Sequence, residues 1–353
     1  MNTKSVDAIA NAVLYEGYML YPYRASSVKN RQRFNFGVLY PQAYSESQSG
    51  SDGCSMQTEC LVEGTSLSAV EVRVRFLKLV DRLVRTLIAT AQKAEGTAVF
   101  EPTSRLEVDG KVFFPWQEAI ECEVAVPACN LDTLTATPLE WKFAFPEKEE
   151  TELLRDSNDR IVGQIVRCQQ PVQGTVEIKT AHEGDDLFKF QVRVKNLTSI
   201  EGDAAQITRE QALVQSLVSA HILLGVVDGQ FVSLLEPPEH LRQIAASCRN
   251  AGAWPVLVGA DKERNTMLCS PIILYDYPQI APESPGDLFD GTEIDEILAL
   301  RILTMTYEEK QEMRNTDERA RKLLERTETL PMEHLMKLHG TLRELRSPKE
   351  EML

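Results

Sequence analysis

The sequence predicts an α+β protein with an antiparallel, sandwich-like β core, a mixed α/β lobe and a helical C-terminal tail. Three observations lead to this fold class. Six segments in the middle of the chain alternate apolar and polar side chains, as half-buried strands do. Short polar turns separate several of these segments, which favours antiparallel neighbours. On either side of them, apolar residues return to helical spacing.

Residues 1–59 form the first predicted region, which begins with an amphipathic helix from Ser5 to Tyr21. Apolar residues recur there at helical spacing. Pro22 is expected to end the helix, because the residue before a proline avoids the helical backbone conformation. Tyrosines and cations then follow as far as Pro41, and the segment from Ser45 to Ser55 has the composition of a loop.

Residues 60–205 are predicted to form the β-rich core domain. The clearest strand is 70–76, where three valines and Phe76 alternate with glutamate and arginine. Short strands joined by polar turns are typical of an antiparallel sheet or sandwich. The predicted strands are 70–76, 121–126, 140–145, 161–167, 175–181 and 188–194.

Residues 206–277 are predicted to form the mixed α/β lobe. Thr208 and Gln211 have the spacing of a capping box, and the uncharged run that follows predicts a buried helix as far as Val227. Two adjacent prolines predict the start of a second helix, which would reach Cys248. Strands are expected at 254–258 and 267–275.

Residues 278–353 are predicted to be a proline-rich linker followed by charged helices. Three prolines and a glycine lie between residues 278 and 286. Capping-box spacings at Thr292 and Thr306 indicate where two helices begin. Beyond Tyr307, side chains of opposite charge are interleaved, which is typical of a solvent-exposed helical face.

Composition limits the class of protein. The chain has 353 residues, seven cysteines and a formal net charge of -15. An acidic surface disfavours nucleic acids, because their binding depends on cationic side chains. The longest uncharged run, 211–227, is too short and too polar to span a bilayer. Without a secretory signal, an odd number of cysteines indicates reduced thiols, so we expect a cytoplasmic protein with no membrane insertion.

Common catalytic and cofactor motifs do not occur in the sequence. The spacings Cys54–Cys60 and Cys122–Cys129 differ from the Cys-x-x-Cys pair that holds structural zinc or iron–sulfur clusters. Neither the nucleophile elbow of hydrolases nor a glycine-rich phosphate loop is present. We therefore expect no bound metal and no cofactor, and the sequence assigns no catalytic residue.

A cluster of tyrosines and cations at residues 14–41 is the strongest candidate for a functional surface. Tyrosine and arginine are enriched in interface hot spots, so one interpretation is a partner-docking surface. A second is an anion or nucleotide pocket. A third pairs the block with the acidic stretch at 276–296. The residues assigned to partner or anion binding are Tyr21, Tyr23, Arg24, Lys29, Arg31 and Arg33, and those of the acidic counter-patch are Asp276, Asp287, Asp290 and Glu293.

Two blocks of the sequence resemble a family of uncharacterised bacterial proteins. They are LYEGYMLYPYRASSVKNRQRFNFGVLYP at 14–41, and WPVLVG at 254–259 with SPIILYDYPQIAPESPGDLFDGTEIDEILALRILTMTYEEK at 270–310. That family is found in gene clusters for uptake NiFe hydrogenases, beside maturation genes. The resemblance implies an accessory protein in the assembly, maturation or quaternary organisation of such a hydrogenase. It brings no catalytic residues with it.

The leading hypothesis is therefore a non-enzymatic assembly or scaffold protein that acts through protein–protein contacts, with a hydrogenase subunit or a maturation factor as its partner. The competing hypothesis is an enzyme or small-ligand-binding protein of unrecognised class. In that protein an anionic substrate would be held by Arg24, Lys29, Arg31 and Arg33. Asp276, Asp287 or Asp290 would act as acid–base groups. A third hypothesis is a homo-oligomer that self-associates through the β-rich core.

Overall fold

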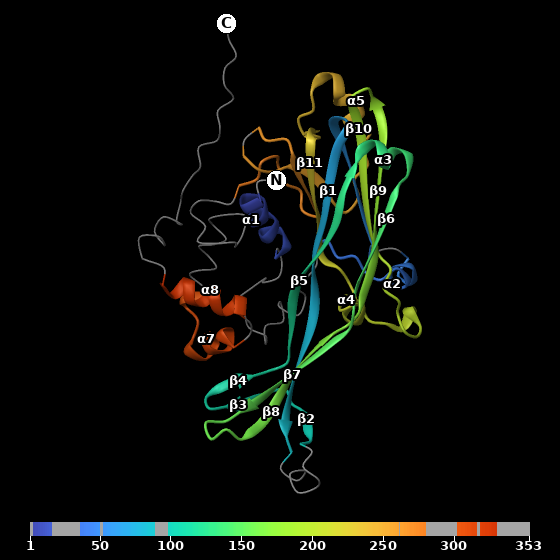
Figure 1. Cartoon of the computed structure of the whole chain (residues 1–353). Helices are drawn as coiled ribbons and strands as arrows, with labels where there is room; N and C mark the ends of the chain where they lie inside the picture. The colour runs from blue at the N-terminus through green and yellow to red at the C-terminus, as the bar shows by residue number, and fades with distance from the viewer. Residues whose placement is uncertain are drawn as a thin grey trace.

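The computed structural model describes residues 3–15, 36–49, 52–88, 98–260, 262–279, 302–315 and 318–329. Within these residues the chain has the predicted α+β fold, in which an antiparallel sheet dominates and a few helices cover it (Figure 1). Eleven of the described strands belong to one sheet, and β3 (Leu106–Val108) and β4 (Lys111–Phe113) form a separate hairpin.

Strand β1 (Ser55–Leu87) runs through the whole sheet and is 33 residues long. Residues 61–63 pair with β10 and β11 at once, so these two strands lie on opposite sides of β1. Further along, β5 follows β10 on one side and β8 follows β11 on the other. The other strands of the sheet are β2 (Phe100–Pro102), β5 (Trp116–Asn130), β6 (Leu139–Phe145), β7 (Lys148–Arg155), β8 (Ile161–Gln169), β9 (Val172–Gly184), β10 (Leu187–Asn196), β11 (Val218–Val232), β12 (Trp254–Leu257) and β13 (Thr266–Ser270).

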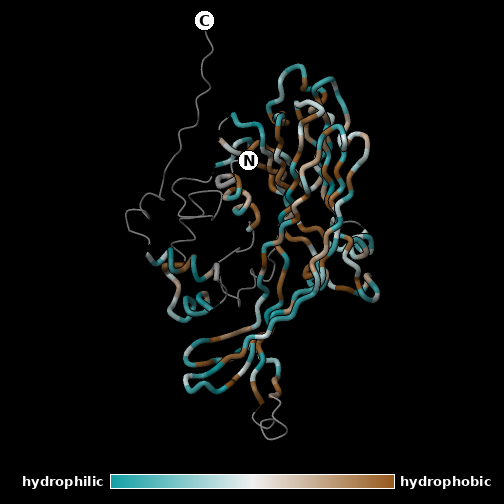
Figure 2. The backbone as a smooth tube through the Cα atoms, in the orientation of Figure 1, coloured by the Kyte–Doolittle hydropathy of each residue, from teal (hydrophilic) through white to brown (hydrophobic). Residues whose placement is uncertain are grey.

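The described strands form two regions that β1 and β5 connect (Figure 1). We call the upper region the body; it contains β6, β9, β10, β11, β12 and β13. We call the lower region the arm; it contains β2, β3, β4, β7 and β8. Hydrophobic segments gather inside the body, whereas hydrophilic and hydrophobic segments mix along the arm (Figure 2). The body therefore contains the main hydrophobic core of the described residues.

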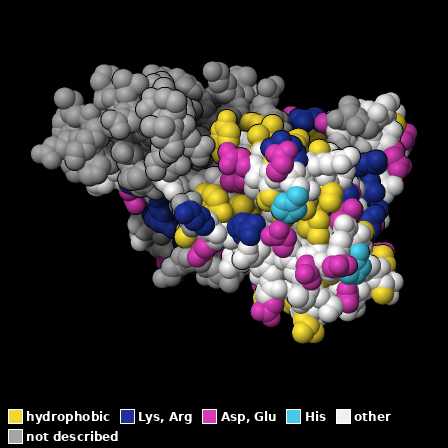
Figure 3. Space-filling view, turned by 90° about the horizontal axis from the view of Figure 1, so that it is seen from above, with side chains coloured by type: hydrophobic (Ala, Val, Ile, Leu, Met, Phe, Trp, Pro, Cys, Tyr) yellow, Lys and Arg dark blue, Asp and Glu magenta, His cyan; other side chains and the backbone are white. Residues whose placement is uncertain are grey.

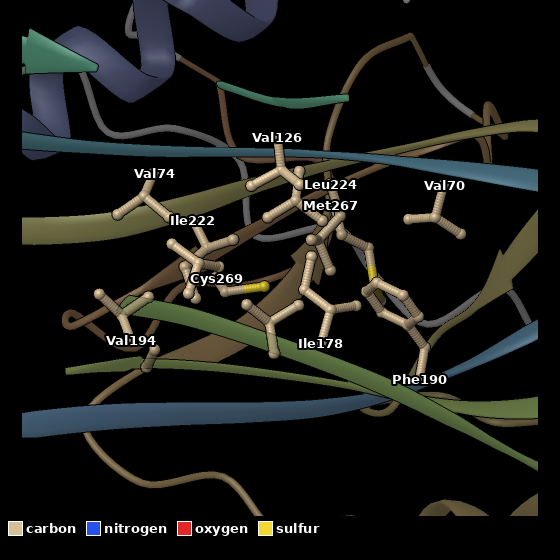
Figure 4. Packing of buried hydrophobic residues seen from close by; sticks show 14 of the residues in the cluster. Val70, Val74, Val126, Ile178, Phe190, Val194, Ile222, Leu224, Met267 and Cys269 are labelled. Carbon is tan, nitrogen blue, oxygen red and sulfur yellow. The ribbon is translucent and has the colours of Figure 1, made fainter. Parts of the chain in front are cut away.

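Side chains from several strands converge in the body core (Figure 4). Phe190 of β10 is fully buried there. Burying a side chain of this size stabilises the fold by about 1.5–3 kcal/mol. The residues labelled in Figure 4 are Val70, Val74, Val126, Ile178, Phe190, Val194, Ile222, Leu224, Met267 and Cys269.

Helices cover the sheet at a few places. Helix α1 buries Val6, Ala10 and Val13 against Leu223 of β11 and Val256 of β12. Helices α7 and α8 join a second hydrophobic cluster that also contains the other face of β1. The described α-helices are α1 (Thr3–Leu14), α2 (Gln42–Ser47), α3 (Leu131–Ala136), α4 (Arg209–Leu213), α5 (Arg242–Ala245), α7 (Tyr307–Arg314) and α8 (Glu318–Thr329).

All six predicted core strands are confirmed, and so are two capping boxes. Residues 70–76 lie within β1, and the other five segments lie within β5, β6, β8, β9 and β10. Thr208 and Gln211 cap α4 reciprocally, and Thr306 and Glu309 do the same for α7. The spacing at Thr292 lies outside the described residues.

The predicted helix from Gln211 to Val227 is wrong. Helix α4 ends at Leu213, and β11 begins at Val218. This strand is central in the sheet and covered on both faces, by the body core and by α1. A strand buried on both faces loses the apolar–polar alternation, so its apolar run resembles that of a buried helix.

Other element boundaries also differ from the predictions. The second helix is reduced to a 3-10 turn at Glu239–Leu241 and the four residues of α5. Strand β13 stops at Ser270, before Pro271, because proline cannot donate to a ladder. The strands of residues 206–277 also join the same sheet as β1, through the pairing of β11 with β1.

Among the described helices, none combines the length and the hydrophobicity that crossing a membrane would require.

Candidate partner-docking site

The predicted partner- or anion-binding residues lie outside the described residues. These are Tyr21, Tyr23, Arg24, Lys29, Arg31 and Arg33, and the same holds for Asp287, Asp290 and Glu293 of the acidic counter-patch. The structure does describe the two ends of the N-terminal block, residues 14–15 and 36–41, and it describes Asp276 of the counter-patch. Tyr15 and Asp276 show how each predicted surface is connected to the fold.

Asp276 holds the end of β12 in place. Its Oδ1 accepts a hydrogen bond of 2.7 Å from the backbone N–H of Leu257, and its Oδ2 accepts one from the hydroxyl of Ser233. The next residue, Tyr277, donates its N–H to the carbonyl of Leu257 at 2.7 Å. Asp276 is thus bound to its own chain, as expected of a residue that fixes a loop against a strand end.

A cluster of charged side chains fixes α1 to β1 and β5. Tyr15 donates its hydroxyl to Glu121 Oε1 at 2.7 Å. Arg75 of β1 donates to Asn11 Oδ1 at 2.7 Å and to Glu121 Oε2 at 3.2 Å. Arg73 lies 3.6 Å from Asp7 of the same helix. The tyrosine- and arginine-rich block therefore begins directly after this anchored helix end.

His221 lies beside this cluster, opposite Arg75 in the pairing of β1 with β11, and it is fully buried. Its Nδ1 is 3.1 Å from the carbonyl of Ser219, which can only accept, so the ring proton is on Nδ1. Burial lowers the pKa of His221 to about 4, with a smaller contribution from Arg75. The ring is neutral at pH 7 and belongs to the packing beneath α1.

Strands β6 to β9 form one long hairpin that is interrupted by two prolines. Phe145 pairs with Val172 on one side of the interruption, and Lys148 pairs with Gln169 on the other. The same register places Pro146 opposite Pro171. Since neither residue has a backbone N–H, the ladder breaks at this pair. The break lies where the body meets the arm.

A buried lysine of β1, Lys78, donates a hydrogen bond to the hairpin at the break. Its ammonium nitrogen donates to the carbonyl of Pro146 at 3.0 Å, and the side chain is only 1% exposed. Burial lowers the pKa of this amine from its ordinary value. The carbonyl of Pro146 has no N–H opposite it on Pro171, and it therefore accepts its hydrogen bond from Lys78 of β1.

A cavity of about 730 Å³ opens at this break, and we call it the hollow. Its apolar lining comes from the body side of the break, from the two prolines, and from Ile200, Ile207 and Val214 around α4. Side-chain amides and two glutamates complete it. No lysine or arginine is found among the described residues of the lining. The residues that line it are Ala144, Phe145, Pro146, Glu147, Gln170, Pro171, Val172, Gln173, Thr198, Ser199, Ile200, Glu201, Ile207, Gln211, Val214 and Gln215.

The polar groups of the hollow are suited to main-chain amides. Gln173 donates its side-chain amide to the carbonyl of Leu197 at 3.1 Å, whereas the side-chain amides of Gln170 and Gln215 make no hydrogen bond with the described residues. A primary amide can both donate to a carbonyl and accept from an N–H. Together with the apolar lining, these groups match an extended peptide with an apolar side chain.

A second cavity, of about 630 Å³, lies between the β3–β4 hairpin and α7. Arg105 and Glu107 line it from the hairpin, and Glu308 and Glu312 line it from the helix. Arg105 already pairs with Glu107 at 3.0 Å. The charges of this cavity are therefore mixed and partly neutralised within the chain.

The buried cysteines are protonated thiols. All seven cysteines are free, and burial raises the pKa of Cys122 to about 11 and that of Cys269 to about 12. A reactive cysteine requires the opposite shift, toward the thiolate. Within the described ranges, no three His, Cys, Asp or Glu side chains gather in a way that would hold a metal ion.

Charges are mixed on the one face that Figure 3 displays. The described Lys and Arg side chains there are interspersed with Asp and Glu, with small hydrophobic areas between them (Figure 3). The described part of that face therefore shows mixed charge rather than the continuous cationic surface that nucleic acids bind.

Comparison with known proteins adds no relative. No protein-family model matches the chain, and a search of curated proteins gives no significant match.

Sequence reasoning missed the hollow, because its residues come from four separate segments. The one local signal was the pair of prolines that interrupts the predicted strands. Their opposition becomes visible only once the register of the hairpin is known.

Proposed function

We propose that the protein is a non-enzymatic accessory protein of the cytoplasm, which holds an extended segment of a partner protein in the hollow. The observation that carries this proposal is the cavity of about 730 Å³ at the break between Pro146 and Pro171. The resemblance to proteins of hydrogenase gene clusters supports a hydrogenase subunit or a maturation factor as the partner.

The lining of the hollow supports a neutral or basic segment. Among the described residues that line it, the charged side chains are Glu147 and Glu201, both exposed. An acidic segment would be repelled by both carboxylates, whereas a lysine or arginine would be attracted. Free side-chain amides can hydrogen-bond the main chain of such a segment, and Phe145 and Ile200 can contact an apolar side chain.

The location of the hollow also supports docking. Its lining joins the hairpin break to the segment that follows β10, and Lys78 fixes the break to β1. A preformed site loses little conformational entropy on binding. A bound partner would thus contact the hairpin break and the segment after β10 at the same time.

Filling the hollow is the direct test. Ser199 is exposed in the lining, so Ser199→Trp should block the hollow without disturbing the core. Affinity-tagged wild-type chain is isolated from its own host beside this variant, and co-purifying proteins are quantified by mass spectrometry. We expect a hydrogenase subunit or maturation factor with the wild type, and at least about a tenfold loss with Ser199→Trp, since a central blocked pocket costs about 2 kcal/mol or more.

Ser157→Trp is the matched control, because Ser157 is exposed in the β7–β8 turn and outside the hollow. This variant should retain the partner as the wild type does. Equal recovery by all three proteins would show that the hollow is not the docking site. A wild-type chain that carries a stoichiometric small molecule and no partner protein would favour the enzyme or ligand-binding hypothesis.

A further inference from the structure

The backbone of β6 has an open edge. In the described sheet β6 pairs with β9 alone. On β9, the N–H of Gln173 donates to Thr198 Oγ1 at 3.0 Å and its carbonyl accepts from Leu197 N–H at 2.9 Å, so both groups point away from β6. Ala144 lies opposite Gln173. In an antiparallel ladder the backbone groups of two opposed residues point either toward each other or both away from each other. The N–H and C=O of Ala144 therefore point toward the open edge.

The alternation of a strand extends this orientation to Lys142 and Glu140. Both residues are exposed, and no backbone partner for their amides or carbonyls is found among the described residues. An open row of this kind is a template for pairing with another strand. The side chains of Glu140 and Lys142 lie on the outer face and are 54% and 80% exposed, respectively. Lys142 Nζ lies 3.7 Å from Glu140 Oε1.

We propose that β6 pairs antiparallel with β6 of a second copy of this chain, with Trp141 on the two-fold axis. The proposal goes beyond the docking function and does not depend on it, because the edge amides of Glu140 and Lys142 lie outside the lining of the hollow. Self-association then uses one continuous sheet across the two copies.

Charge selects this register. The open backbone groups belong to even-numbered residues, so an even-numbered residue must face an even-numbered one. If Lys142 lay on the axis, it would face Lys142 of the second copy, and Glu140 on the axis would likewise face another glutamate. With Trp141 on the axis, Glu140 faces Lys142 of the second copy, and this pair occurs twice. Opposite charges directly across a ladder stabilise it, and like charges destabilise it.

The inner face of β6 fits the same register. Leu139 and Phe143 pack partly buried against the body core, whereas Trp141 is 37% exposed on the same face of the strand. On the axis, Trp141 would cover its counterpart, and Leu139 would face Phe143 of the second copy. Pro138 and Pro146 flank the strand and confine the ladder to β6.

Charge reversal tests the pairing on the full chain by sedimentation velocity over a range of concentrations. The wild type should sediment as a dimer at the higher concentrations. Lys142→Glu and Glu140→Lys each place like charges in both pairs, so each should weaken dimerisation at least about tenfold. The double variant Glu140→Lys with Lys142→Glu restores both pairs and should dimerise about as well as the wild type.

A cysteine on the axis tests the register. Trp141→Cys places two thiols in a non-hydrogen-bonded pair with Cα atoms about 4.5 Å apart, a separation that a disulfide spans. Mild oxidation should therefore give a covalent dimer. Lys142→Cys is the control, because its two introduced thiols would belong to diagonal neighbours about 7–8 Å apart and should not crosslink. Wild-type chain under the same oxidant reports any crosslinking through native cysteines.

A wild type that stays monomeric at all concentrations would overturn the proposal, and so would a dimer that neither single reversal weakens. Failure of the double variant to recover, with its thermal unfolding unchanged, would reject this register. A monomeric wild type that still binds its partner through the hollow would leave the proposed function in place.

Discussion

Strand β9 of the body and strand β7 of the arm belong to the same long hairpin, but they differ sharply in how much they bury. In the body, β9 buries Val172, Val176 and Ile178 at 2% exposure or less. In the arm, β7 exposes all of its side chains except Leu154. The difference comes from what covers each strand. Strand β9 packs against the body core, whereas β7 lies outside β8 in the described sheet, and β8 itself buries Ile165 and Val166. The main hydrophobic cluster of the described residues lies in the body, so most of the folding stability is expected there.

The largest expected effect lies in the body core. Phe190→Ala should lower the free energy of unfolding by about 3–5 kcal/mol, because it removes a fully buried ring and leaves a cavity. Urea unfolding measures this loss. Leu154→Ala in the arm is the comparison and should cost clearly less. Equal costs would mean that the arm is as tightly packed as the body.

Acid sensitivity of the body is the next largest effect. The pKa of His221 is lowered to about 4 from an ordinary 6.5. Between these two pH values the imidazole is protonated in the unfolded chain and neutral in the folded chain. Stability should therefore fall as the pH drops from about 6.5 to about 4, by about 3 kcal/mol in total.

The measurement is urea unfolding at several pH values in that range, for wild type and His221→Asn. The variant keeps a donor toward the carbonyl of Ser219 and loses the titrating ring. Its stability should change less steeply with pH over this interval. Identical slopes for the two proteins would show that His221 is not responsible.

The smallest expected effect lies at the junction. Lys78→Met removes the donor to the Pro146 carbonyl, and it also removes a buried amine whose pKa is lowered by burial. The two changes oppose each other, so the free energy of unfolding should change by about 1 kcal/mol or less.

Amide exchange should nevertheless increase at Glu147 and Gln170, next to the break, and stay unchanged at Val192 in the body. Hydrogen–deuterium exchange followed by mass spectrometry resolves these segments. Faster exchange throughout the body would mean that Lys78 supports the whole core rather than the junction.

The sequence predicted the strands that have one solvent-facing side. Residues 121–126, 175–181 and 188–194 alternate because one face meets the core and the other meets solvent or polar neighbours. The same rule failed for β11, whose two faces are both covered. Alternation also predicted only part of β1, because consecutive residues from 76 to 80 are buried on both faces of the strand. Alternation of apolar and polar residues identifies a strand with one solvent-facing side. It is absent from strands that are buried on both faces.

The candidate site lay beyond sequence reasoning for a different reason. Pro146 and Pro171 are 25 positions apart in the chain, and each alone predicts only a strand end. The hollow needs both prolines opposite each other, the turn before α4, and a lysine from β1 that satisfies the carbonyl. The tyrosine- and arginine-rich block stays a prediction, since its residues from Tyr21 to Arg33 lie outside the described ones.

The proposed docking site is tested most directly by amide exchange of the full chain, alone and with a purified hydrogenase subunit or maturation factor. The proposed function predicts slower exchange at residues 144–147, 170–173 and 198–201, which line the hollow, and no change at the exposed turn 157–159. A complex that forms while all three segments exchange at their free rates would contradict it.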